Sequence, residues 1–169
     1  MKKTISIIII IAMCAMLASC GGVKNEVSDT EQPTLIDTMS LEEKVGQILF
    51  VRCVEDEQTD DLMSIKPGGI LMFGRDFEGL TKDEVKEKIQ SYQDKSDIPL
   101  IIGADEEGGT VVRVSSNPNL APEKFKSPQE IYNEGGMDAV VENATEKSEL
   151  LLSLGVNMNL APVADVSTN

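Results

Sequence analysis

Residues 100–114 read Leu-Ile-Ile-Gly-Ala-Asp-Glu-Glu-Gly-Gly-Thr-Val-Val-Arg-Val and predict a buried strand that ends in a sharp loop. The apolar run 100–102 follows Pro99 without polar alternation, which is typical of a strand buried on both faces in a parallel sheet. Burying the three adjacent carboxylates at 105–107 without partners would be costly, so we expect them at the start of a loop. The glycine pair 108–109 lets the backbone turn tightly and lets a ligand approach it closely.

The same stretch offers a carboxylate and a guanidinium for one site. Arg113 lies eight residues after Asp105, a spacing that lets the loop return a planar cation to the side of the carboxylate. An acidic turn with a solvated arginine explains the spacing equally well, because charged loop residues are common. A metal site is a third interpretation, since hard cations take oxygen ligands. It is disfavoured because the acids are adjacent rather than alternating and the chain has no histidine.

Strand and helix patterns alternate along the rest of the chain. Capping boxes predict helices that begin after Ser40 and Thr81, and apolar spacing predicts a longer helix behind the glycines at 135–136, with Gly155 as its C-terminal cap. Short apolar runs predict strands at 48–54, 70–73, 100–102 and 156–160, with a short helix near 55–66 and a loop at 115–127. Repeated strand–helix units predict an α/β fold with a parallel sheet.

Polar clusters recur directly after the predicted strands, at Arg75-Asp76, at 105–107 and at Asp165. The carboxyl ends of strands carry the functional sites of parallel α/β folds, so we expect a site there. Neither Gly-x-Gly-x-x-Gly nor a Walker-type phosphate loop occurs, which disfavours a nucleotide-binding fold. Cys53 lies in an apolar run and is interpreted as a core residue, because no histidine is present to activate it.

Charge and the first twenty residues bear on location. The formal net charge of −14 disfavours nucleic acid and anionic lipid headgroups as partners. Residues 1–19 combine two lysines, an apolar run and small residues, which is the pattern of a signal peptide. The Leu-Ala-Ser-Cys sequence that ends at Cys20 resembles a bacterial lipobox, and this implies cleavage before Cys20 and its lipidation. An ordinary signal peptide is the alternative. We expect an extracytoplasmic protein anchored to the cell membrane by lipid, with a flexible tether at 20–37 and a folded part at 38–169.

Three motifs in order resemble glycoside hydrolase family 3, and most closely its bacterial β-N-acetylhexosaminidase branch. Residues 105–113 match the signature Asp-x-Glu-Gly-Gly-x-Val-x-Arg. Residues 67–73, Pro-Gly-Gly-Ile-Leu-Met-Phe, resemble the second strand of the family, and residues 159–166 resemble its Ala-Pro-Val-x-Asp-Val strand. The resemblance runs from about Leu41 to the last residue. It implies the N-terminal part, about half, of a TIM-type (β/α)8 barrel.

The resemblance also implies an activity and a set of binding residues. It implies a retaining glycoside hydrolase acting on terminal β-linked N-acetylhexosamine, with a carbohydrate substrate and no metal or cofactor. Asp105 and Arg113 match family positions that line the terminal-sugar pocket, where a carboxylate accepts hydroxyl protons and an arginine fork orients it. Asp165 ends a strand on the same barrel face and is a third candidate for the pocket, with capping of the core as an equal alternative. Glu107 matches a family position, but binding and loop structure cannot be separated there.

The departures from the family predict an incomplete enzyme. The family's nucleophilic aspartate, its sugar-binding Lys-His pair and its histidine–aspartate pair lie on later strands, so we expect no catalytic residue in this chain and interpret it as truncated. A full barrel needs about 200 residues or more, and half a barrel would leave an open edge near Ala161, which predicts low stability or self-association. Alternatives are a non-catalytic sugar-binding surface lipoprotein, a β-glucosidase-type member of the same family, and a transporter's solute-binding lipoprotein. The last is disfavoured because the Glu-Gly-Gly and Ala-Pro-Val motifs have no reason to occur together there.

Overall fold

The computed structural model describes residues 34–164, so Cys20, Asp165 and the predicted signal peptide at 1–19 lie outside the described residues. The helices are α2 (Leu35–Thr38), α3 (Leu41–Gln47), α4 (Thr59–Ser64), α5 (Lys82–Gln93) and α6 (Pro128–Leu154). The strands are β1 (Phe50–Arg52), β2 (Gly69–Met72), β3 (Ile101–Ala104) and β4 (Met158–Asn159), and short 3-10 turns span Asp56–Gln58 and Gly74–Asp76. The predicted order of elements is confirmed. Helix α2 begins inside the segment that we expected to be a tether.

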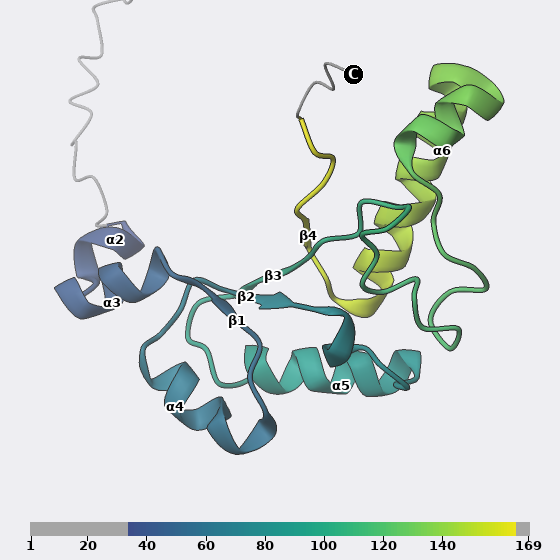
Figure 1. The fold of residues 1–169 in the computed structure, drawn as a ribbon. Helices are drawn as coiled ribbons and strands as arrows, with labels where there is room; N and C mark the ends of the chain where they lie inside the picture. The colour runs from purple at the N-terminus through teal and green to yellow at the C-terminus, as the bar shows by residue number, and fades with distance from the viewer. Residues whose placement is uncertain (1–33, 165–169) are drawn as a thin grey trace, which may run out of the picture. The chain divides into compact units, whose positions relative to one another are not determined.

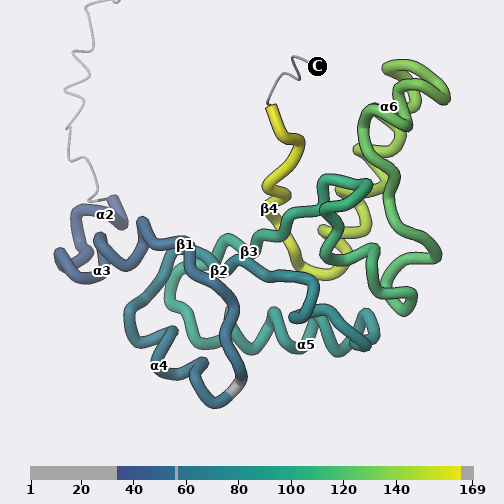
Figure 2. The backbone as a smooth tube through the Cα atoms, in the orientation of Figure 1, coloured from purple at the N-terminus to yellow at the C-terminus, as the bar shows by residue number. Residues whose placement is uncertain are grey.

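The four strands form one parallel sheet in the order β1-β2-β3-β4, as the alternating pattern predicts. Helices α4 and α5 run along one face of this sheet (Figure 1). Residues 105–127 form the green loops between β3 and α6 in the backbone trace (Figure 2). The sheet directs all four carboxyl ends the same way, so the segments that follow the strands are brought to one edge.

The hydrophobic core lies between the sheet and its helices. It combines alternate residues of β2 and β3 with the inward faces of α4, α5 and α6 and with the start of the loop after β3; the buried members are Cys53, Met63, Ile70, Met72, Phe77, Val85, Ile89, Tyr92, Leu100, Ile102, Ala104, Val114, Leu120, Leu151, Leu154 and Val156. Fully burying one such aliphatic side chain contributes about 1.5–3 kcal/mol, so this layer anchors the strand ends. The interpretation of Cys53 as a core residue is confirmed, since its side chain is fully buried.

The opposite face of the sheet is covered less completely: the expectation that the run 100–102 is buried on both faces is wrong at Ile101, whereas Gly69 and Gly103 on the same face are buried. Ile101 is 42% exposed and Phe50 is 39% exposed, because helices cover only one face of the four strands. The Phe50 ring lies across β2 and β3 on this inner face. A Cβ atom added at Gly69 or Gly103 would lie within 2.6 Å of a ring carbon of Phe50, so both strands need glycine at these positions.

Capping explains where the helices begin, and it corrects the start of α6. The predicted boxes at Ser40 and Thr81 are confirmed, with each hydroxyl accepting the N–H of the glutamate three residues on. A third box, Ser127 with Glu130, starts α6 nine residues before the predicted start, and Gly136 kinks the helix with φ of 69° rather than preceding it. Gly155 ends α6 in the left-handed conformation, as expected.

Glu43 provides a testable pH dependence. Its carboxylate accepts hydrogen bonds from Lys66 Nζ at 2.6 Å and from the Ser40 N–H at 2.8 Å. These contacts, Lys66 first, lower the pKa of Glu43 to about 2. A carboxyl group with a lowered pKa stabilises the folded state above its ordinary pKa of about 4.3, and this contribution is lost as the pH falls toward 2.

We therefore expect urea unfolding to show a steeper loss of stability between about pH 4 and pH 2 in the unmodified chain than in Glu43→Gln. Glu42→Gln removes the same charge from the neighbouring position and should keep the steep dependence. Parallel pH profiles for the unmodified chain and Glu43→Gln would contradict the assignment.

Candidate active site

Asp105 and Arg113 form the centre of the candidate site. Asp105 follows β3 directly, and Arg113 Nη2 donates to Asp105 Oδ2 at 3.2 Å. Their side chains are 22% and 27% exposed, so the pair is accessible but not freely solvated. The pairing inferred from the spacing is confirmed, and the solvated-arginine interpretation is wrong. A carboxylate oriented by a guanidinium presents acceptors, and donors beside them, to polar groups of a ligand.

The glycine pair closes the loop between these two side chains. Gly108 has φ of 100° and Gly109 has φ of 69°, which non-glycine residues rarely adopt. The N–H groups of Glu107 and Gly108 both donate to Val111 O at 3.0 Å. A Cβ atom at Gly108 would lie 2.2 Å from Lys126 O, so the backbone of the following loop requires glycine here.

Glu106 is the residue of this site that the sequence did not reveal, because we expected all three acids at the start of a loop rather than in the interior. Its side chain is fully buried. Oε2 accepts the N–H groups of Arg113 and Val114, both at 2.7 Å, while Oε1 accepts the Ser115 N–H at 3.3 Å and the Ser115 hydroxyl. Four donors replace water, so burial of this carboxylate is compensated. Glu106 thereby holds the backbone that carries Arg113.

Two asparagine side chains join the β4 segment to the backbone on both sides of β3. The Asn159 side chain accepts the Glu106 N–H at 2.9 Å and donates to Glu106 O at 3.1 Å. The Asn157 side chain accepts the Ile102 N–H at 2.8 Å and donates to Leu100 O at 3.2 Å. The alternation Val-Asn-Met-Asn-Leu was the only sequence signal for this arrangement. Asn159 therefore fixes the backbone on which Asp105 and Glu106 stand.

Lys147 supports the loop from α6. Its side chain is buried, and Nζ donates to Glu107 O at 2.8 Å and lies 5.4 Å from the centre of the Phe125 ring. Burial lowers the pKa of the Lys147 ammonium, and the nearby Glu106 and Glu107 carboxylates act in the opposite direction. A lysine in a helix is usually a surface residue, so this contact could not be predicted from the residue type.

We expect Lys147→Met to loosen the loop without unfolding the chain. Methionine keeps the apolar stem, but the Glu107 carbonyl loses its donor, a loss of about 1 kcal/mol. Amide hydrogen exchange at Gly108 and Gly109 should become roughly fivefold to tenfold faster. Lys86→Met, on the exposed face of α5, is the matched control. Unchanged exchange at the two glycines would show that Lys147 does not hold the loop.

Phe73 and Arg52 extend the site toward β1. The Arg52 guanidinium lies 4.9 Å from the centre of the Phe73 ring, and the Arg113 guanidinium lies 5.7 Å from it. Arg75 and Asp76, the weaker candidates from the sequence, serve the chain itself. Asp76 is buried and accepts the Phe73 N–H at 2.7 Å, and Arg75 donates to Cys53 O at 3.3 Å.

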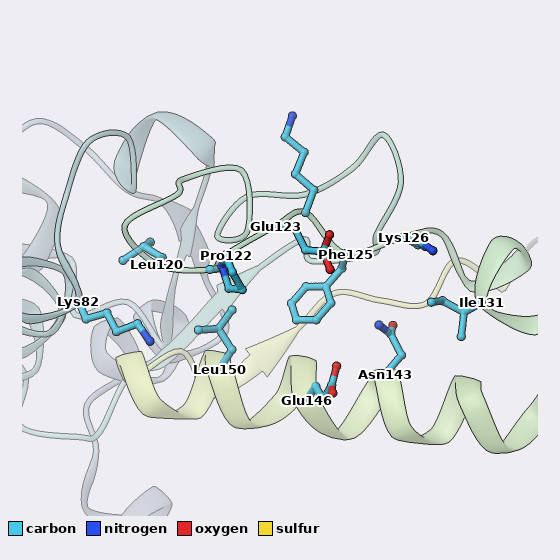
Figure 3. Close-up of a pocket in the computed structure, with 12 residues that line it drawn as sticks. Lys82, Leu120, Pro122, Glu123, Phe125, Lys126, Ile131, Asn143, Glu146 and Leu150 are labelled. Carbon is cyan, nitrogen blue, oxygen red and sulfur yellow. The ribbon is translucent and has the colours of Figure 1, made fainter. Parts of the chain in front are cut away.

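Other features of the described residues lie away from this pair. A cavity of about 540 Å³ lies between residues 120–126 and α6, with the Phe125 ring directed toward the helix (Figure 3). Neither Asp105 nor Arg113 lines it.

Between residues 34 and 164, no cluster of three acidic or cysteine side chains is suited to hold a metal ion. Within the same range, no helix has both the length and the apolar character needed to cross a membrane.

Comparison with known proteins agrees with this geometry. The model of the glycosyl hydrolase family 3 N terminal domain matches residues 40–169, most of the chain, and the chain belongs to this family. The four parallel strands are accordingly the N-terminal part of a TIM-type barrel, as the sequence predicted.

Beta-hexosaminidase A of Pseudoalteromonas piscicida is 30% identical over 105 residues, which cover 60% of this chain and 18% of that protein. A beta-hexosaminidase of Haemophilus influenzae is 24% identical over 113 residues, 67% of this chain and 32% of its own length. The chain thus spans no more than a third of these relatives.

A solved structure of a family 3 beta-N-acetylglucosaminidase from Paenibacillus sp. str. FPU-7 superposes with a TM-score of 0.64 at 26% identity. It covers 73% of this chain and 24% of its own.

Proposed function

We propose that this chain supplies part of the sugar pocket of a glycoside hydrolase that removes terminal β-linked N-acetylhexosamine from amino-sugar glycans. The observation that carries the proposal is the Asp105–Arg113 pair at the carboxyl end of β3 in a family 3 domain. Relatives named beta-hexosaminidase and beta-N-acetylglucosaminidase support this sugar in preference to glucose.

In this proposal Asp105 and Arg113 bind and orient the terminal sugar. The Asp105 carboxylate accepts the protons of two sugar hydroxyls, and Arg113 fixes the carboxylate and donates to a third polar group. A retaining hydrolysis also needs a nucleophilic carboxylate and a group that donates and later accepts a proton. We assign both of those roles to residues of the whole protein other than 34–164. Asp165 remains a proposed member of the sugar pocket.

A lipid anchor at Cys20 is a second part of the proposal. The lysines, the apolar run and the Leu-Ala-Ser-Cys sequence in residues 1–20 support it. Acyl chains would hold the enzyme at the extracytoplasmic face of the membrane, beside cell-wall glycans. Labelled palmitate should be incorporated into the protein and lost in Cys20→Ser, and that variant should move to the soluble fraction. A membrane-bound, unlabelled protein would exclude this anchor.

The experiment that tests the activity compares residues 1–169 with the protein expressed from the native gene. Both are given 4-nitrophenyl N-acetyl-β-D-glucosaminide and 4-nitrophenyl β-D-glucoside. We expect the native gene product to hydrolyse the first faster, and residues 1–169 to hydrolyse neither. Preference for the glucoside would indicate the β-glucosidase branch. Sugar binding without hydrolysis by the native gene product would support a sugar-binding lipoprotein, and absence of both would overturn the proposal.

A further inference from the structure

The arginines of this chain are concentrated at one edge of the sheet. The sequence has fifteen basic residues, and only three are arginine: Arg52, Arg75 and Arg113. Arg52 is the last residue of β1, Arg75 lies in the turn after β2, and Arg113 lies in the loop after β3. A protein with a net charge of −14 thus places all its planar cations beside the carboxyl ends of successive strands. Guanidinium groups are suited to bidentate binding of oxyanions.

Two of these arginines have acidic partners within the chain. Arg113 pairs with Asp105 at 3.2 Å, and Arg75 lies 3.6 Å from Asp76 and 3.9 Å from Glu55. These pairs neutralise their own charges, so neither arginine offers a full positive charge to a ligand.

Arg52 differs from both. Among the described residues it has no carboxylate within 4.0 Å, its side chain is exposed, and its recorded partner is the Phe73 ring at 4.9 Å. A cation stacked on an aromatic ring at an exposed site gains about 0.5–1 kcal/mol, enough to favour one orientation of the planar group. Arg52 is therefore an oriented guanidinium with free donors.

The sheet register places Arg52 on the same face as the candidate site. Side chains alternate along a strand, so Arg52 shares a face with Phe50, whose ring lies over Gly69 and Gly103 on the inner face. Asp105 is two residues beyond Gly103 along the chain, and Arg113 contacts the same Phe73 ring as Arg52. The unpaired Arg52 guanidinium and the Asp105–Arg113 pair therefore lie beside the same aromatic ring, that of Phe73.

We propose that Arg52 binds an anionic group, a carboxylate or a sulfate, on the glycan whose terminal sugar is held by Asp105 and Arg113. This inference rests on the proposed function and names its substrate class. An acidic protein surface repels an anionic glycan over several ångströms, so a local unpaired cation is what makes such a substrate acceptable. The anionic group belongs either to the terminal sugar itself or to the part of the substrate that leaves.

The test uses the native gene product, Arg52→Gln and two matched pairs of N-acetyl-β-glucosaminides. The 4-nitrophenyl glycoside and its 6-O-sulfate place the charge on the terminal sugar. The 4-carbamoylphenyl and 4-carboxyphenyl glycosides place it on the leaving group. Lys86→Gln removes the same charge from the exposed face of α5 and is the control.

We expect Arg52→Gln to lower kcat/KM about tenfold or more for the anionic member of one pair, and less than about twofold for its neutral partner. The pair that shows this loss identifies the source of the charge. Arg52→Lys keeps the positive charge but lacks the paired N–H donors of a guanidinium, so it should retain part of kcat/KM for the anionic substrate. Lys86→Gln should change none of the four rates. Equal losses on neutral and anionic substrates, or no loss, would overturn the inference.

Hydrolysis of none of the four glycosides by the unmodified protein would overturn the proposed function instead. Calorimetric binding of the same glycosides then decides the role of Arg52. A preference for the anionic members that disappears in Arg52→Gln supports the anion site, and the absence of any such preference overturns it.

Discussion

Asp105→Ala is expected to lower kcat/KM for 4-nitrophenyl N-acetyl-β-D-glucosaminide by about 100-fold or more in the native gene product, while the fold survives. The carboxylate would accept two sugar hydroxyls, and each hydrogen bond to a charged group contributes about 1.5–3 kcal/mol. Two such bonds correspond to roughly 10²-fold to 10⁴-fold in binding. Because Asp105 is partly exposed, water can hydrate Arg113 once the carboxylate is gone.

The kinetic constants locate the effect. A rise in KM with kcat unchanged would show that Asp105 binds substrate and transition state equally, whereas equal losses in kcat and kcat/KM would show an interaction made only in the transition state. Asp105→Asn should retain part of the binding, since its amide oxygen still accepts. Asp138→Ala, on the exposed face of α6, is the control. Unchanged kinetics in Asp105→Ala would remove this residue from the site.

Glu106→Ala should reduce the free energy of unfolding by about 3–5 kcal/mol. The substitution leaves three backbone N–H groups and the Ser115 hydroxyl without their acceptor in a buried place. Each unsatisfied buried donor costs about 1–3 kcal/mol, although water entering the new cavity would recover part of this. Urea unfolding measures the loss, and exchange of the Arg113 and Val114 amides reports where it arises.

Glu106→Gln removes the negative charge of this side chain but keeps its size, so it separates the effects of the two. Its amide oxygen can still accept the N–H groups of Arg113 and Val114, but its NH2 group then faces the Ser115 N–H, so we expect a smaller loss of about 1–2 kcal/mol. Glu87→Gln, on the exposed surface of α5, should leave stability unchanged. A Glu106→Ala chain as stable as the unmodified one, with unchanged amide exchange, would contradict the role assigned to this carboxylate.

The elements of this fold that could be predicted are those that local sequence patterns determine. Capping boxes, apolar runs and glycine turns depend on residues a few positions apart, so the order of strands and helices followed from them. The Asp105–Arg113 pair could also be predicted from the sequence, because one short loop joins the two residues. The box at Ser127 and Glu130 was also present, but the glycines at 135–136 were interpreted as the boundary of the helix rather than as a kink.

The unpredicted part depends on contacts between distant segments or on the backbone. Glu106 is satisfied by N–H groups, which every residue except proline carries, so no residue type in the sequence identifies its partners. Lys147 reaches Glu107 across 40 positions of sequence. The exposure of Ile101 depends on which face the helices cover, and an apolar run alone does not state this.

The Asn159 side chain sets a point in protein synthesis before which the end of β3 cannot be completed. Asn159 grips the Glu106 backbone across 53 positions of sequence, so the strand end that carries Asp105 is completed only after Asn159 has left the ribosome. Until then β3 pairs with β2 on one side but lacks β4 and the Asn159 hydrogen bonds on the other side. In a nascent chain arrested before Asn159, the loop between Asp105 and Arg113 should not adopt its final conformation. In a chain arrested well beyond Asn159, Asp105 and Arg113 should be paired. The loop that carries Asp105 and Arg113 is thus completed only when β4 has been synthesised, although both residues leave the ribosome earlier.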